Sequence, residues 1–210
     1  MHAVIKILKK EILAWVVPVV GHYKDDPFKV LISCLLSLRT QDKTTAAASA
    51  RLFVLAQTPE QMNQLSVKII EKAIYPVGFY ITKARRIPQI CQILLDQYHG
   101  KVPDDLDTLL ALPGVGRKTA NLVLTLGHDK MGICVDVHVH RISNRWGYVK
   151  TKTPEETEFA LRKKLPKKYW KTYNDLLVAF GQNLCKPISP FCSRCSLTRF
   201  CLQVGVGSRR

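Results

Sequence analysis

A short segment with two glycines, Leu112-Pro113-Gly114-Val115-Gly116-Arg117-Lys118-Thr119-Ala120, constrains this chain more than any other part of it. Glycine has no Cβ, so these positions permit a tight turn and the close approach of another molecule to the backbone. Pro113 favours the entry to such a turn. The residues from Arg117 onward predict a helix, whose first amides have no partner within the helix. The segment therefore predicts an anion site at a helix start, although an ordinary turn into a packed helix gives the same pattern.

The charge of the chain points to a polyanionic partner. Its 210 residues carry 32 Lys and Arg against 16 Asp and Glu, a formal net charge of +16. A hydrophobic content of 47% is sufficient for a packed core and argues against disorder. The excess of basic residues favours nucleic acid over a membrane as the partner, with a merely solvated basic surface as the alternative.

The sequence contains no convincing membrane span or signal peptide. The apolar run at residues 12–20 contains Pro18 and is too short to cross a bilayer. Lys9 and Lys10 precede this run as in a signal peptide, but Glu11 interrupts it and no small-residue cleavage site follows. We therefore expect an intracellular protein (cytoplasm or nucleoid in a prokaryote) that works as a monomer and has no membrane partner.

The periodicity of apolar residues predicts an all-α protein. Asp25-Asp26-Pro27 predicts the start of a central apolar helix at 28–38, and Asp42 is expected to cap a second helix at 43–56. A long helix is expected at 80–98, kinked or split by Pro88. No alternating pattern is long enough to build a sheet. Further helices are expected near the N-terminus (with Val4, Ile5, Leu8, Ile12, Trp15 and Val16 facing a core), after Thr58-Pro59, at 67–75, after Pro103, at 137–146, after Pro154 and at 169–184.

Four cysteines near the C-terminus, Cys185, Cys192, Cys195 and Cys201, form the pattern C-x6-C-x2-C-x5-C. So short a segment can surround one small inorganic centre with four thiolates. The spacing favours an iron–sulfur cluster over structural zinc, because only one Cys-x2-Cys pair is present and zinc sites usually have two. Disulfides are the third alternative, since an intracellular chain rarely keeps them. The other three cysteines, Cys34, Cys91 and Cys134, have apolar neighbours and are expected in the core.

With these features together, the chain resembles the endonuclease III family of DNA glycosylases, within the helix-hairpin-helix superfamily. Three segments carry the resemblance over nearly the whole chain, in the family's order: Leu112 to Asn121, Val135-Asp136-Val137-His138-Val139-His140-Arg141, and the four cysteines. The resemblance implies a two-lobed, all-helical fold in which residues 21–132 form a six-helix barrel lobe with the hairpin. The other lobe would be discontinuous, with residues 1–20 and 133–210, and would hold a [4Fe–4S] cluster on Cys185, Cys192, Cys195 and Cys201.

The same resemblance implies a bifunctional glycosylase and AP lyase of base excision repair, acting on double-stranded DNA that contains a damaged base or an abasic site. Lys118 would attack the sugar C1′ and form a Schiff base, which allows β-elimination of the 3′ phosphate. Asp136 would stabilise the positive charge that develops on the sugar and accept the lysine proton. On local grounds alone, Lys118 could equally contact a phosphate, and Asp136 could simply cap a helix.

The resemblance also implies a set of DNA contacts. Backbone groups of Gly114, Val115, Gly116 and Arg117 would hold a phosphate near the lesion. Phe79 aligns with a residue that wedges into the base stack, although a core phenylalanine has the same pattern. Arg39 stands where many relatives have glutamine, and could read the opposite base, preferably guanine. His138 matches a common histidine of the family and is expected mainly to make a structural hydrogen bond.

Two other functions stay open at the level of the sequence. Arg39 is compatible with a mismatch glycosylase that removes thymine or uracil opposite guanine. A non-catalytic DNA-binding module with a structural metal centre would explain the charge, the hairpin and the cysteines. That alternative leaves the pairing of Lys118 and Asp136 at two helix starts unexplained.

Overall fold

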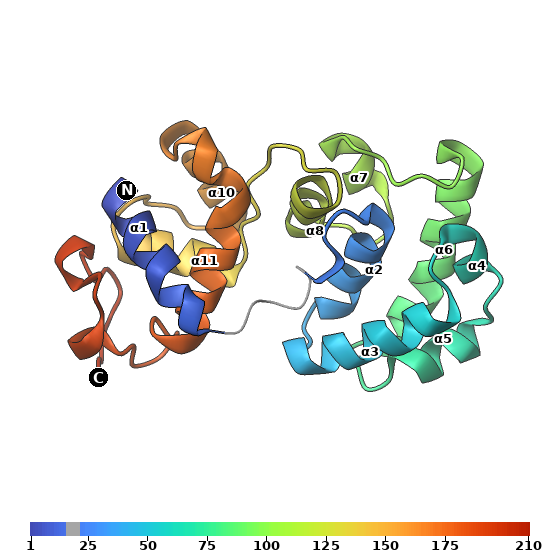
Figure 1. Ribbon diagram of the computed structural model, residues 1–210, viewed down its shortest axis with the longest axis horizontal. Helices are drawn as coiled ribbons and strands as arrows, with labels where there is room; N and C mark the ends of the chain where they lie inside the picture. Colours follow the sequence, from blue (N-terminus) through green and yellow to red (C-terminus); the bar gives the residue numbers. More distant parts are fainter. Residues whose placement is uncertain (16–21) are drawn as a thin grey trace. The chain divides into compact units, whose positions relative to one another are not determined.

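The computed structural model describes residues 1–15 and 22–210. It divides the chain into two compact units, and we describe each by itself (Figure 1). The continuous unit is Val19–Gly132, and the discontinuous unit combines Met1–Pro18 with Ile133–Arg210. The described residues contain helices and no strand, which confirms the all-α prediction. None of their helices has both the length and the apolar composition that crossing a bilayer requires.

The continuous unit is built around α2 (Pro27–Ser37), whose side chains are mostly buried. This helix packs against α3, α6, α8 and the π-helical turn after α8, which confirms its predicted central position. The unit contains α2, α3 (Asp42–Leu55), α4 (Pro59–Asn63), α5 (Val67–Ile74), α6 (Tyr80–Tyr98), α7 (Leu106–Ala111), α8 (Arg117–Leu122) and the π-helical turn η3 (Val123–Gly127).

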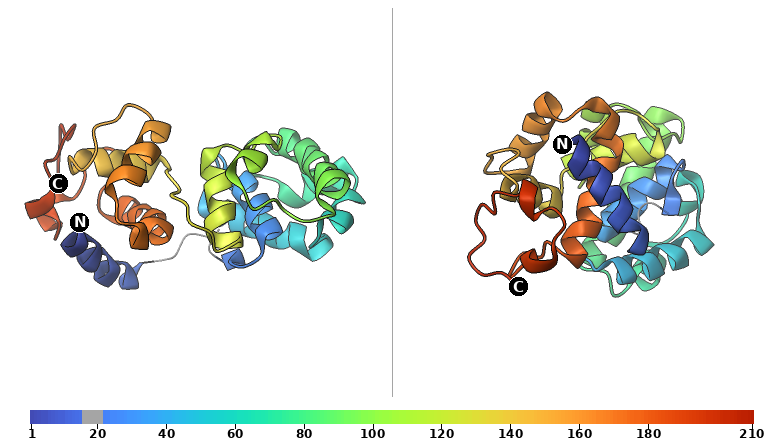
Figure 2. Two further views of the ribbon diagram at one scale, coloured as in Figure 1. Left: turned by 90° about the horizontal axis from the view of Figure 1, so that it is seen from above. Right: turned by 60° about the vertical axis from the view of Figure 1, so that its left-hand side comes forward.

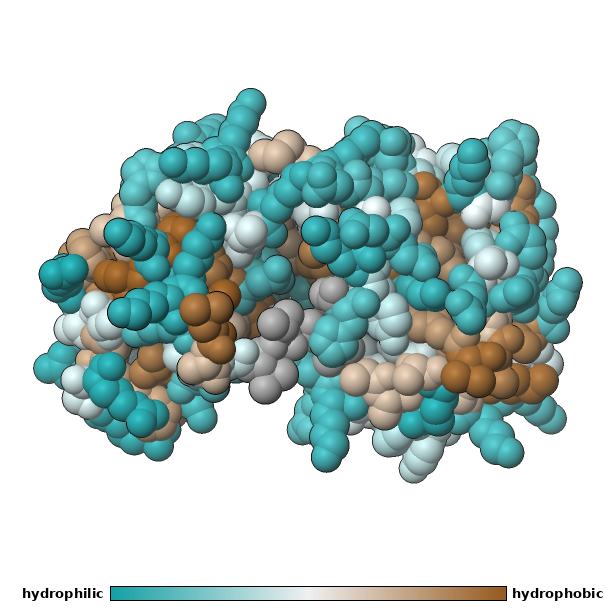
Figure 3. All heavy atoms as spheres, viewed as in Figure 1, coloured by the Kyte–Doolittle hydropathy of each residue, from teal (hydrophilic) through white to brown (hydrophobic). Residues whose placement is uncertain are grey.

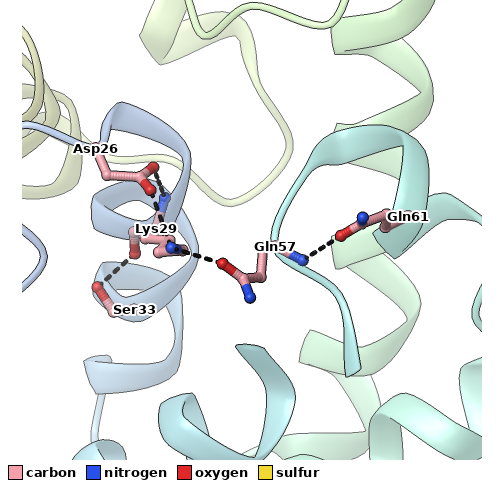
Figure 4. Close-up of polar contacts among 5 residues, drawn as sticks. All are labelled: Asp26, Lys29, Ser33, Gln57 and Gln61. Atoms are coloured by element: carbon pink, nitrogen blue, oxygen red, sulfur yellow. Dashed lines mark hydrogen bonds and ion pairs between the residues drawn. The ribbon is translucent and has the colours of Figure 1, made fainter. Parts of the chain in front are cut away.

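The start of α2 forms as the sequence predicts. Asp26 caps it, because its Oδ1 accepts a hydrogen bond from the Lys29 backbone amide at 2.9 Å. The Lys29 ammonium contacts Asp26 Oδ2 at 3.3 Å and donates to Gln57 Oε1 at 3.1 Å. The backbone amide of Gln57 in turn donates a hydrogen bond to Gln61 Oε1 (Figure 4). These contacts tie the start of the central helix to the loop between α3 and α4.

Two local expectations in this unit are wrong. Gln41, not Asp42, is the residue before α3, and Asp42 is the first residue of the helix. There its charge still lies at the favourable end of the helix dipole. For Pro88, the expected split of the long helix is wrong, since α6 runs without a break from Tyr80 to Tyr98, whereas the alternative of a kink stays a prediction. The π-helical turn at Val123–Gly127 was not expected, since sequence periodicity alone does not distinguish it from an α-helix.

The discontinuous unit joins both ends of the chain. Figures 1 and 2 show α1 (His2–Glu11) lying beside α11 (Trp170–Asn183), although they are far apart in the sequence. Their shared core includes Ile5, Leu8, Val139, Tyr173 and Phe180. Ile12 and Trp15 pack against this core as expected, and Val16 lies outside the described residues. The remaining elements are α9 (Val137–Arg145), α10 (Pro154–Lys164) and the 3₁₀ turns η1 (Ile12–Ala14), η4 (Lys167–Tyr169), η5 (Cys192–Arg194) and η6 (Thr198–Phe200).

Candidate active site and cysteine loop

The glycine hairpin joins α7 to α8 and takes the geometry that its glycines permit. Gly114 has φ of +77°, a left-handed conformation that favours glycine. Gly116 precedes α8, where no side chain caps the helix. A Cβ placed on Gly116 would meet no atom within 4 Å, so the space beside this residue is open. The Val115 side chain is buried, so only its backbone can face a ligand.

Lys118 lies in the first turn of α8, directly after the hairpin, and is half-buried, as is Arg117. Its neighbours Thr119 and Ala120 are buried in the continuous unit. Lys118 also lies near the buried thiol of Cys34 on α2. Burial raises the pKa of Cys34 to about 12, and the positive charge of Lys118 partly offsets this rise. Helix α8 thus holds Lys118 in its first turn, next to the buried side of α2.

Asp136 lies at the start of α9 in the discontinuous unit. Its Oδ1 accepts hydrogen bonds from the backbone amides of His138 and Val139, both at 2.9 Å. These two bonds fix the orientation of the carboxylate, and they confirm Asp136 as a helix cap. The capping is compatible with a catalytic role, because both amides bind Oδ1 and neither of these two bonds uses Oδ2.

A second carboxylate, on Asp175 of α11, was not singled out from the sequence. Burial raises the pKa of Asp175 to about 6, and the negative charge of Asp136 adds to the rise. The adjacent Asn174 donates to the carbonyl of Cys134, at 3.4 Å, in the segment that leads to Asp136. Packing of α11 therefore gives the environment of Asp136 an extra acidic group.

His138 makes a hydrogen bond within its own unit, which is the kind of contact that the sequence favoured. Arg141 Nη2 lies 3.0 Å from its Nδ1 and donates to the carbonyl of Cys185 at 2.9 Å. A Cβ on Gly181 of α11 would lie too close to His138 Nδ1, so that glycine leaves room for the ring. His138 thus packs between α9 and α11 within its own unit.

Arg39 and Phe79, the two proposed contacts to the base stack, lie together in the continuous unit. The Arg39 guanidinium carbon is 5.4 Å from the centre of the Phe79 ring, and 60% of the Phe79 surface is exposed. Phe79 is therefore not a core residue. Both side chains line a pocket of about 390 Å³ that the hairpin reaches through Gly114.

Three polar residues of this pocket were missed by sequence reasoning: Thr82, Lys83 and Arg86, all on α6. Arg86 lies against the hairpin, since its Nη1 is 2.8 Å from the position of a Cβ on Gly114. Spacing along α6 was the available signal, because residues 79, 82, 83 and 86 share one helical face. Among the residues that the structure describes, the pocket lining contains three basic side chains and no acidic one.

The four C-terminal cysteines, Cys185, Cys192, Cys195 and Cys201, line one small pocket and form no disulfide. In the described part of the chain, no three His, Cys, Asp or Glu side chains are arranged to hold a metal ion. Buried Arg145 lies beside this pocket, with its Nη1 3.5 Å from Cys185 Sγ and 2.6 Å from the Lys186 carbonyl. The four thiols are not gathered as ligands in the described residues, but their number and the buried cation that can offset thiolate charge match the donor set of a group with four cysteine ligands.

Comparison with known proteins identifies the fold and the family. Residues 32–167 match the family described as "HhH-GPD superfamily base excision DNA repair protein". The chain is 50% identical over 181 residues to endonuclease III of Thermotoga maritima, covering 86% of this chain and 85% of that one. It also superposes on a non-covalent endonuclease III–DNA complex with a TM-score of 0.87 and 34% identity, covering 96% of this chain and 94% of the other. A trapped endonuclease III–DNA covalent intermediate matches with a TM-score of 0.85 and 35% identity, over 94% and 92% of the two chains.

The chain therefore belongs to the HhH-GPD superfamily of base excision DNA repair proteins. Within this superfamily its identity and coverage place it in the endonuclease III family, which confirms the resemblance seen in the sequence.

Proposed function

We propose that this protein is a bifunctional DNA glycosylase and AP lyase that excises oxidised or damaged pyrimidines from duplex DNA through a Schiff base on Lys118. Membership of the endonuclease III family makes it an enzyme of this class. The observation that carries the assignment of the residue is the position of Lys118, two residues after the open space beside Gly116. A lysine at that position can reach the sugar next to a phosphate bound by the hairpin.

DNA binding begins with charge. The formal net charge of +16 attracts the phosphate backbone, and hydrophilic side chains cover much of the face shown in Figure 3. The backbone at Gly114, Val115 and Gly116 binds a phosphate near the lesion. Arg39 and Phe79 occupy the gap left when the damaged nucleotide leaves the stack. Because base excision repair acts on the genome, we infer that the protein works inside the cell.

The chemical steps use an amine and a carboxylate. The neutral amine of Lys118 forms a bond to C1′, and the bond from C1′ to the base breaks, with its electron pair leaving on the base. Asp136 accepts the proton that the amine loses. The nitrogen lone pair of Lys118 then forms the C1′=N bond of a Schiff base while the C1′–O4′ bond breaks, and O4′ leaves with that electron pair and takes the proton from Asp136. Loss of a proton from C2′ then expels the 3′ phosphate with its electron pair, and hydrolysis of the Schiff base releases the enzyme.

We infer that Cys185, Cys192, Cys195 and Cys201 hold a [4Fe–4S] cluster. When bound, the cluster would cross-link the loop through four iron–sulfur bonds. Arg145 holds the start of this loop through the carbonyls of Lys186 and Pro187. Purified protein should contain iron and acid-labile sulfide in equal amounts. Cys192→Ser should lose both and Cys91→Ala, in the core of the other unit, should keep them. Zinc without sulfide would contradict the inference.

Borohydride trapping tests the catalytic proposal. Wild-type protein, mixed with a duplex that contains one oxidised pyrimidine, should give a covalent adduct in borohydride, and Lys118→Ala should give none. Lys72→Ala, which changes an exposed lysine of α5, is the matched control and should react like the wild type.

Two other outcomes identify the alternatives. Release of thymine or uracil opposite guanine, without an adduct, would indicate a monofunctional mismatch glycosylase. Intact DNA binding, without base release from any damaged or mismatched duplex, would indicate a binding module.

A further inference from the structure

A buried lysine, Lys83 on α6, stands apart from the catalytic residues. Only 8% of its surface is exposed, and no carboxylate is among its hydrogen-bond partners in the described residues. Its ammonium donates to the carbonyls of Leu36 at 2.9 Å and Leu38 at 2.7 Å, and to Thr40 Oγ1 at 3.4 Å. An ammonium group has three protons, so all of its donors are used.

These three acceptors lie at and just after the end of α2. Leu38 is the residue that follows the helix, so Lys83 places its positive charge at the negative end of the helix dipole. Thr40 lies in the loop between α2 and α3. Its Oγ1 also accepts a hydrogen bond from the Gly78 amide at 3.2 Å, which joins this loop to the loop between α5 and α6. A Cβ on Gly78 would lie 2.5 Å from the Arg39 carbonyl, so the two loops are in direct backbone contact.

Each of the joined loops carries one of the two proposed contacts to the base stack. Arg39 and Phe79 have φ of +53° and +58°. These are left-handed backbone conformations that residues other than glycine rarely take. Such conformations persist where the surrounding structure holds them, and they are frequent at ligand-binding sites. In this protein, the surrounding contacts run from Lys83 through Thr40 to Gly78, which directly precedes Phe79.

We propose that Lys83 is a positioning residue, which holds Arg39 and Phe79 together in the geometry needed to separate the damaged nucleotide from its opposite base. The proposal rests on the function proposed above. Lys83 would touch neither the sugar nor the base, and would act through the two loops that it joins. An apolar or neutral group cannot replace it, because a neutral side chain has at most two donors for the three acceptors.

The charge state of Lys83 gives the proposal a signature. Burial lowers the pKa of Lys83 to about 8, and the other charged groups of its pocket, Arg39 and Arg86, are also basic. Loss of its proton removes one donor from the loop contacts. Positioning should therefore weaken as pH rises through about 8.

The test compares two DNA substrates in borohydride trapping with the full chain. One is an intact duplex with one oxidised pyrimidine, and the other lacks the nucleotide opposite that pyrimidine, so no base pair has to be separated. Lys83→Met should slow trapping on the intact duplex by about tenfold to a hundredfold, the effect of a small misplacement. It should have little effect on the gapped duplex. Lys72→Met, at an exposed position of α5, is the control.

The outcomes separate this inference from the proposed function. Equal trapping of both substrates by Lys83→Met and wild type would overturn the inference while leaving the function intact. Failure of the wild type on both substrates would overturn the function.

If Lys83→Met does not fold, Thr40→Val removes the hydroxyl that joins the loops and should show the same substrate dependence. An equal loss on both substrates by a folded Thr40→Val variant would contradict the positioning role. The ratio of intact to gapped rates in wild type should fall above pH 8 and stay level in Lys83→Met.

Discussion

The starts of α8 and α9 place the two proposed catalytic residues, but they are built in opposite ways. At α8, Gly116 offers no side-chain cap and leaves open space beside the backbone. At α9, the Asp136 carboxylate binds two amides of its own helix. A helix start has unpaired amides that require an acceptor. One helix receives the acceptor from its own sequence, whereas we propose that the other receives it from DNA.

The starts of α8 and α9 also differ in the charge of the side chains around them. We call the start of α8 open and that of α9 closed. Gly114 lies against Arg86, and Arg117 and Lys118 follow the hairpin, so the neighbours of the open start are basic. The closed start has a second carboxylate nearby, on Asp175, and one cation, Arg141, which interacts electrostatically with Asp136. A basic, open helix start suits an incoming phosphate, and an acidic, closed one suits a cationic sugar.

Asp136→Asn should reduce the rate of base excision by about 10²- to 10⁴-fold, the range for loss of an acid–base group. The amide oxygen of asparagine can still accept both backbone bonds, so the helix cap should persist. Single-turnover excision, together with thermal unfolding, separates chemistry from folding. Asp107→Asn, at an exposed position in the first turn of α7, is the matched control. A rate near that of the wild type would leave Asp136 as a cap alone.

The predictability of these residues from sequence depends on the range of their interactions. A cap is local, so Asp26 and Asp136 could both be recognised from the few residues that follow them. The hairpin is local for the same reason. Asp42 shows the limit, since a cap and the first helical residue differ by one position and share the same preference for acidic residues.

The roles of Asp175 and Lys83 could not be recognised, because they depend on tertiary packing; the spacing along α6 indicates only that Lys83 shares a face with Phe79 and Arg86. Asp175 meets Asp136 only when α11 packs against α9. Lys83 acquires its acceptors from a segment more than 40 residues earlier in the chain. Neither residue lies in a motif, and in the sequence each is an ordinary charged residue on a helix. The roles of Lys118, Asp136 and the four cysteines came from recognised motifs and stay predictions.

Asp175→Asn should stabilise the protein at pH 7 by up to about 3 kcal/mol, the value of a two-unit shift in pKa. The folded protein raises the pKa of Asp175 from 3.8 to about 6, so between these values it binds more protons than the unfolded chain. Stability of the wild type should therefore fall as pH rises through this window. Urea unfolding at several pH values should show this slope reduced in Asp175→Asn. An unchanged slope would mean that Asp175 is not destabilised by its surroundings.

Gly116→Asp would give the open helix start the kind of cap found at the closed one. We expect binding to duplex DNA to weaken by about 10- to 100-fold, the value of one charge-assisted hydrogen bond. The slope of log affinity against log salt should fall by about 1. Stability should change little, because replacing glycine at this position by aspartate gains only about a few tenths of a kcal/mol. Gly207→Asp, where a Cβ also meets open space, should lower affinity less.

Comparison of Asp136→Ala with Asp136→Asn gives the smallest effect and isolates the capping role of this residue. Alanine cannot accept the amides of His138 and Val139, so the variant should lose about 1 kcal/mol of stability. In a protein of 210 residues this loss lowers the melting temperature by about 2–4 °C. Asparagine keeps the acceptor, and its melting temperature should stay close to that of the wild type. If both variants lose equal stability, the negative charge at the helix start, rather than the hydrogen bonds, holds α9 in place.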